Sequence, residues 1–515
     1  MHTSRYTTQI PLPDSSDVLI MHGYSGAFDR VPASVAAYLR ALAAPRARPL
    51  HGQWSPEPPA GAVTPPPPSV LERLRRRGYL TDRSVEDEQA VVRKLAAALH
   101  EAEKQPAYVL MTTYDCNLRC PYCFQDELRT DPSKRALLKR MTPALVDRIF
   151  AAMPGIEARH GIDPARAPRP QFMLFGGESL LADNRPLVEY ILLRAKNAGA
   201  DSLGAISNAT ELDAYADLLG PGLISFLQIT LDGVPEEHDR RRIYPDGSGS
   251  FDRIARNIDL ALERGVRVDV RLNLDRRNLA DLPRLAEIMC GRGWDRQPTF
   301  TAYGAAIFAG NDAVERAHLM DNGQLSRALK SLHASLPATR VIGRPSDGLK
   351  TTLGKVFAQK GDPLQSFRSS YCGAHSSMYV FDPLGDIYAC WERTGDASKR
   401  VGWVDEAGVA IFPPPAAPPT RGDGKRGLPV VQKEPRDLQT WRARTISTNP
   451  TCLDCRYAFY CGGGCAVRAW EDNGGYYSNY CDGFQAQFRA AAVEAYADHV
   501  AGVRVVDSPA SFCSA

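Results

Sequence analysis

Residues 108–123 read YVLMTTYDCNLRCPYC and place three cysteines directly after a short apolar stretch. These cysteines are Cys116, Cys120 and Cys123, and their spacing is CxxxCxxC. A cubane iron–sulfur cluster that only carries electrons is held by four thiolates, so three thiols in one loop leave one iron free to bind another molecule. Zinc sites usually close at four ligands that include CxxC pairs, and no second pair or His pair follows within this loop. The run therefore indicates a strand followed by an iron–sulfur cluster with an open iron.

The composition is that of an ordinary globular protein. Of the 515 residues, 44% are hydrophobic and 23% are charged, and the formal net charge is only +3. So small an excess offers no overall field for nucleic acid or an anionic membrane, and we expect neither as a partner. The sequence shows no signal-peptide core and no membrane-spanning stretch. The twelve cysteines are then expected to be thiols or metal ligands in the cytoplasm, because a reducing compartment keeps disulfides from forming.

Apolar strand-like stretches alternate with amphipathic helical stretches from Ala107 to about Ile307. Such alternation is typical of parallel strands joined by crossover helices. We therefore predict an α/β fold with a partial (β/α)6 TIM-like barrel, in which the cysteine loop lies at the C-terminal ends of the strands, where the active sites of such barrels form. The expected strands are Tyr108–Thr112, Gln171–Phe175, Leu203–Ser207, Phe226–Leu231, Val266–Leu274 and Thr299–Ile307. The expected helices include Thr142–Ala152, Pro186–Lys196 and Phe251–Arg264, the last closed by Gly265.

Four further regions flank the barrel core, which we expect to span residues 106–310. Residues 1–105 are expected to form a small N-terminal α+β domain, with a hairpin over 17–31, a helix from Pro32 to Leu42, and a helix from Val70 that ends before Gly78. A proline-rich tract, Pro56–Pro68, links the two helices. The other expected regions are a linker region with helical patches at 311–365, a cysteine-rich domain at 366–490, and a C-terminal helix and tail at 491–515.

A second set of cysteines lies near the C-terminus. Cys372 and Cys390 are joined by a strand, a tight turn that ends in Gly385, and a second strand. Five more cysteines follow, the first four spaced CxxCxxxxxCxxxC: Cys452, Cys455, Cys461, Cys465 and Cys481. Seven thiolates exceed what one metal ion or cluster binds, so we expect at least two metal centres. Cys290 stands apart in an amphipathic stretch and is expected to be a small core residue.

With the aromatic Tyr122 between its last two cysteines, the first loop resembles the signature of the radical S-adenosylmethionine (SAM) enzymes. The resemblance implies that Cys116, Cys120 and Cys123 hold a 4Fe–4S cluster whose free iron binds the amino and carboxylate groups of SAM. It also implies SAM contacts at the ends of the later strands, and the predicted cofactor-binding residues are Tyr122, Gly176, Gly177, Glu178, Ser207, Asn208, Thr230, Arg242 and Asn273. Helix caps and barrel-rim salt bridges use the same residue types, so a structural role is the alternative for each later contact.

The C-terminal cysteines resemble the SPASM extension found in part of this family. The resemblance implies two auxiliary 4Fe–4S clusters, which makes three clusters in all. The first would use Cys372, Cys390 and Cys465, and the second would use Cys452, Cys455, Cys461 and Cys481. No further cysteine follows Cys372 closely, so the first auxiliary cluster is expected to have an open iron or a ligand from elsewhere, such as Cys513. A pair of zinc ribbons is the alternative for this region.

The resemblance also implies an activity. In this family SAM is cleaved reductively to a 5′-deoxyadenosyl radical that removes hydrogen from an unactivated carbon, and a flavodoxin- or ferredoxin-type protein is implied as the electron donor. Members with the extension mostly modify ribosomal peptides, and residues 1–105 are similar to small winged-helix domains that bind leader peptides. A generic N-terminal cap over the barrel is equally compatible with that region. We therefore predict an oxidoreductase that cross-links a ribosomally synthesised precursor peptide.

The residues after Cys390 bear on the choice of substrate. Sulfatase maturases of this family tend to carry an aspartate there, whereas this chain has Trp391 and Glu392. Glu392 or Asp386 is predicted as a base on the substrate side, with a solvated charge as the alternative for each. Two other functions stay open: a sulfatase-type formylglycine maturase or small-molecule radical SAM dehydrogenase, and a non-catalytic iron–sulfur or zinc binding protein.

Overall fold

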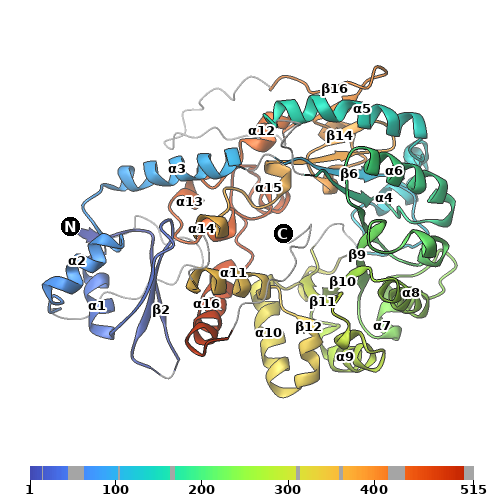
Figure 1. Cartoon of the computed structure of the whole chain (residues 1–515). Coiled ribbons are helices and arrows are strands. Elements are labelled where there is room, and N and C mark those ends of the chain that lie inside the picture. The colour runs from blue at the N-terminus through green and yellow to red at the C-terminus, as the bar shows by residue number, and fades with distance from the viewer. Residues whose placement is uncertain are drawn as a thin grey trace.

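The computed structural model describes residues 1–13, 15–43, 63–102, 105–162, 169–308, 314–358, 363–415 and 435–503. Cys513 and residues 56–62 of the predicted proline-rich tract lie outside these ranges. The strands of the barrel occupy one side of the molecule, the N-terminal region occupies the other, and C-terminal helices lie between them (Figure 1). Within the described ranges, no helix is both long enough and apolar enough to cross a membrane.

The central sheet contains the six parallel strands that the sequence predicts. Their order in space follows their order in the chain, and every neighbouring pair is parallel. The strands are β6 (Ala107–Met111), β7 (Gln171–Phe175), β8 (Leu203–Ser207), β9 (Ile224–Leu231), β10 (Arg267–Leu274) and β11 (Phe300–Ala306). Helices α5 (Pro143–Arg159), α6 (Arg185–Asn197), α7 (Pro235–Arg241), α8 (Phe251–Glu263) and α9 (Leu282–Gly291) lie between them in the chain and cover the outer face (Figure 1). The predicted α/β barrel is confirmed.

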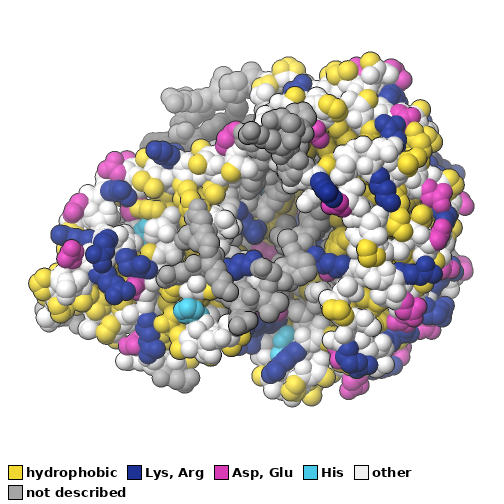
Figure 2. Space-filling view, viewed as in Figure 1, with side chains coloured by type: hydrophobic (Ala, Val, Ile, Leu, Met, Phe, Trp, Pro, Cys, Tyr) yellow, Lys and Arg dark blue, Asp and Glu magenta, His cyan; other side chains and the backbone are white. Residues whose placement is uncertain are grey.

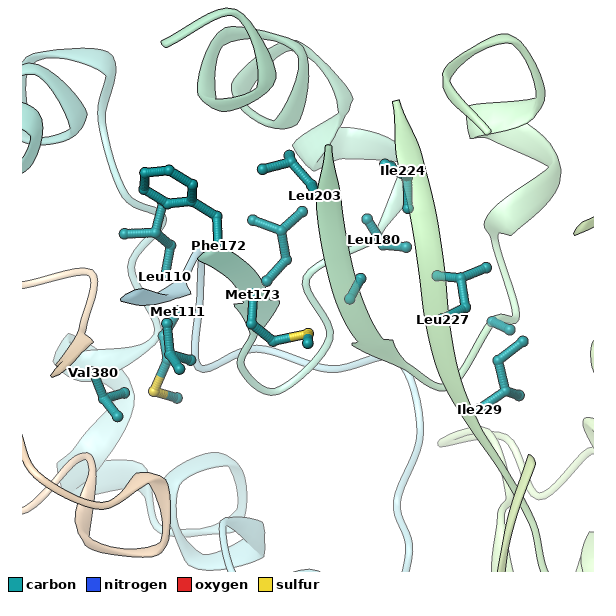
Figure 3. Close-up of a cluster of buried hydrophobic side chains, with 14 of the residues drawn as sticks. Leu110, Met111, Phe172, Met173, Leu180, Leu203, Ile224, Leu227, Ile229 and Val380 are labelled. Atoms are coloured by element: carbon teal, nitrogen blue, oxygen red, sulfur yellow. The ribbon is translucent and has the colours of Figure 1, made fainter. Parts of the chain in front are cut away.

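The barrel strands are apolar because helices and the barrel interior bury both of their faces. In β7, consecutive side chains of Phe172, Met173 and Leu174 are all buried, and they pack with residues of neighbouring strands (Figure 3). Helix α8 instead buries a stripe at helical spacing, which includes Ile254, Ile258 and Leu262. Gly265 follows α8 with φ +73°, a conformation that favours glycine. Because the six strands are parallel neighbours, their carboxyl ends lie at one rim.

Helix α5 is longer than the sequence predicts. A proline inside a helix removes a hydrogen bond and usually ends or kinks the helix, so the helix was expected to stop at Ala152. The structure continues α5 to Arg159 with Pro154 inside it. Met153 and Ile156 are buried in the barrel core, and this packing outweighs the local cost of the proline.

The cysteine-rich C-terminal region shares the sheet of the barrel. Strand β13 (Met378–Phe381) pairs with β6 in parallel, and β14 (Asp386–Tyr388), β15 (Gly402–Val404) and β16 (Ala410–Ile411) extend the same sheet with antiparallel pairing. The predicted turn between Cys372 and Cys390 is present, and Gly385 has φ +86° there. The short helices α12 (Leu438–Arg442), α13 (Pro450–Leu453), α14 (Ala458–Cys461) and α15 (Ala466–Asn473) then carry or flank the later cysteines.

The segment expected as a linker region contains ordered elements. Strand β12 (Ile342–Gly343) pairs with β11 at the free edge of the barrel sheet. Helices α10 (Asn322–Ser335) and α11 (Asp347–Phe357) pack against the long C-terminal helix α16 (Phe484–Val500). The expected boundary at residue 490 falls inside α16, whose first turn contains no acidic residue and no side-chain cap that the sequence could reveal.

The N-terminal region contains the predicted hairpin and helices. Strands β2 (Thr7–Pro11), β3 (Val18–His22) and β4 (Phe28–Val31) form an antiparallel sheet, and β1 (His2–Thr3) pairs with β5 (Leu80–Thr81). Helices α1 (Ala33–Ala41) and α2 (Pro68–Arg76) pack on this sheet, and α3 (Val85–Ala102), which the sequence analysis missed, leads to the barrel. One face of the sheet shares a core with α11, α16 and the segment from Cys452 to Tyr460.

Candidate active site

The first cysteine loop begins where β6 ends, at the rim of the barrel. Cys120 is buried, and Cys116 and Cys123 are half-buried. Burial raises the pKa of Cys116 to about 11 and that of Cys120 to about 12, and the Cys123 thiol adds to the rise in both cases. The three predicted ligands therefore face one another closely enough to interact electrostatically.

The Gly-Gly-Glu turn after β7 packs directly against the start of this loop. The amides of Gly177 and Glu178 donate to the carbonyls of Thr113 and Asp115 at 3.0 and 2.8 Å. A Cβ atom on Gly177 would collide with the backbone carbonyls of Tyr114 and Asp115, and one on Gly176 would collide with that of Thr113. Both glycines are required because the two backbones touch, and this contact places the turn beside the cysteine loop.

Glu178 is buried and joins the second loop to the third. Its carboxylate accepts hydrogen bonds from the Leu180 amide at 2.8 Å, the Ser207 hydroxyl at 2.8 Å and the Asn208 amide at 2.5 Å. Burial raises the pKa of Glu178, and the three donors oppose that rise. A carboxylate has about four acceptor positions, so the three bonds leave room for a ligand amine.

The Asn208 side chain connects the third loop to the cysteines. Its amide donates to Asn117 Oδ1 at 2.9 Å and lies 3.7 Å from Cys116 Sγ. The next residue, Ala209, has φ +60°. The turn therefore keeps the left-handed conformation that a glycine would favour, with an alanine in its place.

Tyr122 lies at the centre of a buried polar group. Its hydroxyl donates to the Asp232 carboxylate and accepts from Arg242 at 3.0 Å and from the Asn273 amide at 3.4 Å. Arg242 Nε and Asp232 Oδ1 are both buried, and neither has a hydrogen-bond partner within the described residues. Buried polar atoms normally find partners, so a polar ligand fits here. Thr230 is half-buried on β9, in register with Arg271 of β10.

Arg129 is a site residue that the sequence analysis missed. It lies on the short helix α4 (Asp126–Thr130), and its guanidinium donates to Cys123 Sγ at 3.3 Å. The Arg129 side chain is only 2% exposed, and its Nε and Nη1 atoms lack partners among the described residues. The Arg129 charge also lowers the pKa of Cys116, against the larger rise that burial causes. The signal in the sequence was weak, because FQDELRT is indistinguishable from a polar surface helix.

Four C-terminal cysteines surround one cavity. Cys452, Cys455, Cys461 and Cys481, together with Gly463 and Asn479, line a cavity of about 30 Å³. These four are the predicted ligands of the second auxiliary cluster, and the donor set of four thiols suits an iron–sulfur cluster. Among the described residues, no three His, Cys, Asp or Glu side chains are grouped so that they could hold a single metal ion.

Cys372, Cys390 and Cys465, the predicted ligands of the first auxiliary cluster, also lie near one another. Burial raises the pKa of Cys390, and the carboxylate of Glu392 and the other two thiols raise it further. Glu392 is also 3.4 Å from the guanidinium of Arg468. Asp386, the first residue of β14, forms a 2.8 Å ion pair with Arg400. Both predicted bases are therefore ion-paired, and only Glu392 lies beside the cysteines.

The segment after Cys390 packs on the barrel loops. The rings of Trp391 and Phe175 are 5.4 Å apart, and Phe175 directly precedes the Gly-Gly-Glu turn. Gln125 donates to the Thr394 hydroxyl at 3.2 Å. Tyr114 donates to Asp382 in the β13–β14 turn at 2.9 Å. The barrel site and the first auxiliary cysteine group therefore share a direct boundary, which residue spacing could not reveal.

Comparisons with known proteins agree with this geometry. A family model described as the radical SAM superfamily matches residues 110–289. The Fe-coproporphyrin III synthase of Methanosarcina barkeri (strain Fusaro / DSM 804) is 26% identical over 197 residues, which cover 36% of this chain and 41% of that protein. The match thus spans less than half the length of this curated relative.

Solved structures share the fold over a larger part of the chain. Native anSMEcpe with bound AdoMet, which is SAM, has a TM-score of 0.53 at 16% identity and covers 77% of this chain and 100% of its own. Native anSMEcpe with bound AdoMet and the Cp18Cys peptide has a TM-score of 0.51 at 13% identity, with 77% and 99% covered. With the three-thiol loop at the end of β6, these findings show that residues 110–289 form a radical SAM domain.

Proposed function

We propose that this chain is a radical SAM enzyme that oxidatively modifies a ribosomally synthesised precursor peptide. The observation that carries the cofactor part is a pair of buried atoms beside the three-thiol loop, Arg242 Nε and Asp232 Oδ1, which have no hydrogen-bond partner among the described residues. An arginine suits a carboxylate and an aspartate suits an amine, and SAM has both groups. Bound SAM and a 4Fe–4S cluster on Cys116, Cys120 and Cys123 would supply the one-electron chemistry, while the protein orients them.

The residues of the site have distinct roles in this proposal. Tyr122 and Asn273 orient Arg242 and Asp232, and Glu178 positions the loop that carries Asn208. The Gly176–Gly177 turn packs against the backbone of the cysteine loop and so places Glu178 beside it. Thr230 is proposed as a further contact with the carboxylate of SAM.

Two auxiliary 4Fe–4S clusters belong to the same proposal. Cys452, Cys455, Cys461 and Cys481 would hold the second, and the cavity that they share supports this assignment. Cys372, Cys390 and Cys465 would hold the first. The eleven described cysteines are all free thiols, which agrees with a reducing compartment, so we propose a cytoplasmic protein with a flavodoxin- or ferredoxin-type electron donor.

A peptide is the proposed substrate because the fold resembles that of a protein with a bound peptide, the anSMEcpe complex with Cp18Cys. Trp391 and the half-buried Phe175 form an aromatic wall between the barrel site and the first auxiliary cysteine group. Glu392 is the proposed base on the substrate side. The match to an Fe-coproporphyrin III synthase supports a second candidate, a radical SAM enzyme that acts on a small molecule.

Anaerobic reconstitution with iron, sulfide, SAM and a reductant tests the catalytic part. We expect 5′-deoxyadenosine to form in the wild-type chain. The variant Cys290→Ala should form it as well, because Cys290 lies on α9 and is not a proposed cluster ligand. If the purified protein binds zinc instead of iron and forms no deoxyadenosine, the proposed radical SAM activity is refuted.

Co-expression with a candidate precursor peptide tests the substrate. We expect a mass loss of two hydrogens per modification, and we expect a core peptide without its leader to be modified much more slowly. Deletion of residues 1–105 is unsuitable here, because this region shares a core with the segment that carries Cys452. Turnover of a porphyrin but of no peptide would favour the second candidate, and formylglycine on a sulfatase would indicate a maturase of that type.

A further inference from the structure

Arg444 is a buried arginine between the two auxiliary cysteine groups. It lies in the segment between α12 and α13 and is 2% exposed. Four of its N–H groups donate to backbone carbonyls: Nε to Tyr476 at 2.9 Å, Nη1 to Gly464 at 2.9 Å, and Nη2 to Gly463 at 3.2 Å and to Ser478 at 2.9 Å. A single guanidinium therefore joins two loops that are not adjacent in the chain.

Both loops carry proposed cluster ligands. Gly463 and Gly464 lie between Cys461, assigned to the second auxiliary cluster, and Cys465, assigned to the first. Ser478 precedes Cys481, which completes the second set. Gly463 also lines the cavity of the four thiols, and a Cβ atom on it would lie 3.5 Å from Cys452 Sγ. Arg444 therefore positions ligands of both groups at once.

Among the residues that the structure describes, no carboxylate forms an ion pair with Arg444. Within the described residues its partners are backbone carbonyls alone. An arginine stays charged in proteins, and a buried charge requires an anionic partner. Thiolates are the available anions: Arg444 donates to Gly463 and Gly464, and these two glycines lie between Cys461 and Cys465. These two cysteines belong to different groups.

Neighbouring arginines make other contacts. Arg468 pairs with Glu392 at 3.4 Å and with Glu471 at 2.7 Å. Arg442, two residues before Arg444, lies over the Tyr379 ring at 4.7 Å from its centre. Arg442 is a suitable control because its contact with the Tyr379 ring does not involve a cysteine loop.

We infer that Arg444 is the shared positioning residue and counter-cation of the two auxiliary centres, and that it raises the reduction potential of a cluster bound at either one. The inference rests on the proposed auxiliary clusters. A nearby cation stabilises the more negative, reduced cluster, and cluster charge and surroundings set the potential. Arg444 is assigned no contact with substrate.

The test compares Arg444→Gln, Arg444→Lys and Arg442→Gln in the full-length reconstituted chain. Iron content and redox titration followed by electron paramagnetic resonance are the measurements. In Arg444→Gln we expect both auxiliary potentials to fall while the SAM-binding cluster keeps its potential. In Arg444→Lys we expect the auxiliary potentials to stay near those of the wild type, because the charge remains, and iron loading to drop, because the four-carbonyl clamp is lost. Arg442→Gln should match the wild type.

Each part of the inference can be overturned. Unchanged reduction potentials of both auxiliary clusters in iron-loaded Arg444→Gln would refute the counter-cation role of Arg444. A change in the potential of only one auxiliary cluster would refute the role that the two clusters share. Full iron loading of Arg444→Lys would refute the clamp, and this result can be obtained even if Arg444→Gln retains no iron. A wild-type chain that binds only about four iron atoms, enough for one cubane, would refute the auxiliary clusters themselves. This outcome differs from a wild-type chain with all three clusters in which the Arg444 substitutions have no effect, which would refute only the role of Arg444.

Discussion

In the barrel, three cysteines lie in one loop at the end of β6, whereas the seven C-terminal cysteines come from segments between residues 372 and 481. The barrel loop is positioned by regular structure, since a parallel sheet aligns its strand ends and the Gly-Gly-Glu turn packs backbone against backbone. The C-terminal groups lie among short helices and turns, where Arg444, the β13–β14 turn and the N-terminal sheet position them. A site at strand ends therefore depends on close backbone contact, and a site among irregular loops depends on buried side chains from distant segments.

Charges of both signs are present on the face of the molecule shown in Figure 2. Lys and Arg side chains are interspersed with Asp and Glu on the face shown in Figure 2, in keeping with the net charge of +3. The two regions differ in how buried contacts position their cysteines.

The largest effect is expected at the barrel loop itself. Cys116→Ala removes one of three thiols, and we expect deoxyadenosine formation to fall to the level measured without enzyme, because the cluster that binds SAM is lost. The auxiliary iron should remain, at about two thirds of the total. Loss of all iron from this variant would show that the two regions do not assemble independently.

Gly177→Ala tests the dependence on backbone contact. The new Cβ meets the carbonyls of Tyr114 and Asp115, which cannot move without shifting the loop, so we expect a loss of about 3 kcal/mol in the free energy of unfolding. Urea denaturation of the metal-free chain measures it. Gly155→Ala on α5 is the control: nothing lies within 4 Å of its Cβ, and a gain of about 0.5 kcal/mol is expected. Equal stability of both variants would contradict the backbone contact.

Gly23→Ala tests the contribution of the N-terminal sheet. The added Cβ would collide with the carbonyl of Arg456, next to Cys455, so we expect a loss of about 2 kcal/mol and faster release of iron from the second auxiliary site under a chelator. Deoxyadenosine formation should be nearly unchanged. An unaltered rate of iron release would separate the N-terminal region from this centre.

The pH dependence of the free energy of unfolding tests the boundary between the two regions, where Asp382 accepts a hydrogen bond from Tyr114. Burial, with Asp386 nearby, raises the pKa of Asp382 to about 7, above the unfolded value of about 3.9. The folded state therefore binds the proton more tightly, so this group's contribution to stability is complete below about pH 4 and is lost as the pH rises through 7, by up to about 1.4 kcal/mol per pH unit. Unfolding measured from pH 4 to 8 should show this slope, and Asp382→Asn should reduce it.

The smallest effect is expected at Ala209. Its left-handed backbone, φ +60°, costs an alanine about 1 kcal/mol relative to glycine, so Ala209→Gly should raise the free energy of unfolding by up to that amount. Ala255→Gly in helix α8 should lower it by about 1 kcal/mol. A loss of stability in Ala209→Gly would mean that its buried methyl group outweighs the strain.

Much of the barrel could be predicted because its signals are local. The strands from Gln171 and Leu203 have the predicted bounds, since an apolar run between glycine-rich turns in a parallel sheet needs no distant partner to be recognised. Helix α5 was predicted too short at Pro154, and α3 was missed, since packing against other segments decides both. Arg129 and Arg444 were missed because nothing near them in the chain distinguishes a buried arginine from a solvated one.

The sequence by itself determined the parallel barrel and the radical SAM signature, because strand periodicity and the spacing CxxxCxxC are properties of neighbouring residues. Only the tertiary structure showed that β13 extends the barrel sheet, that the N-terminal sheet shares a core with the Cys452 segment, and that Arg444 joins two cysteine loops. Those contacts join residues far apart in the chain, and the burial that removes an arginine from water exists only once the chain has folded.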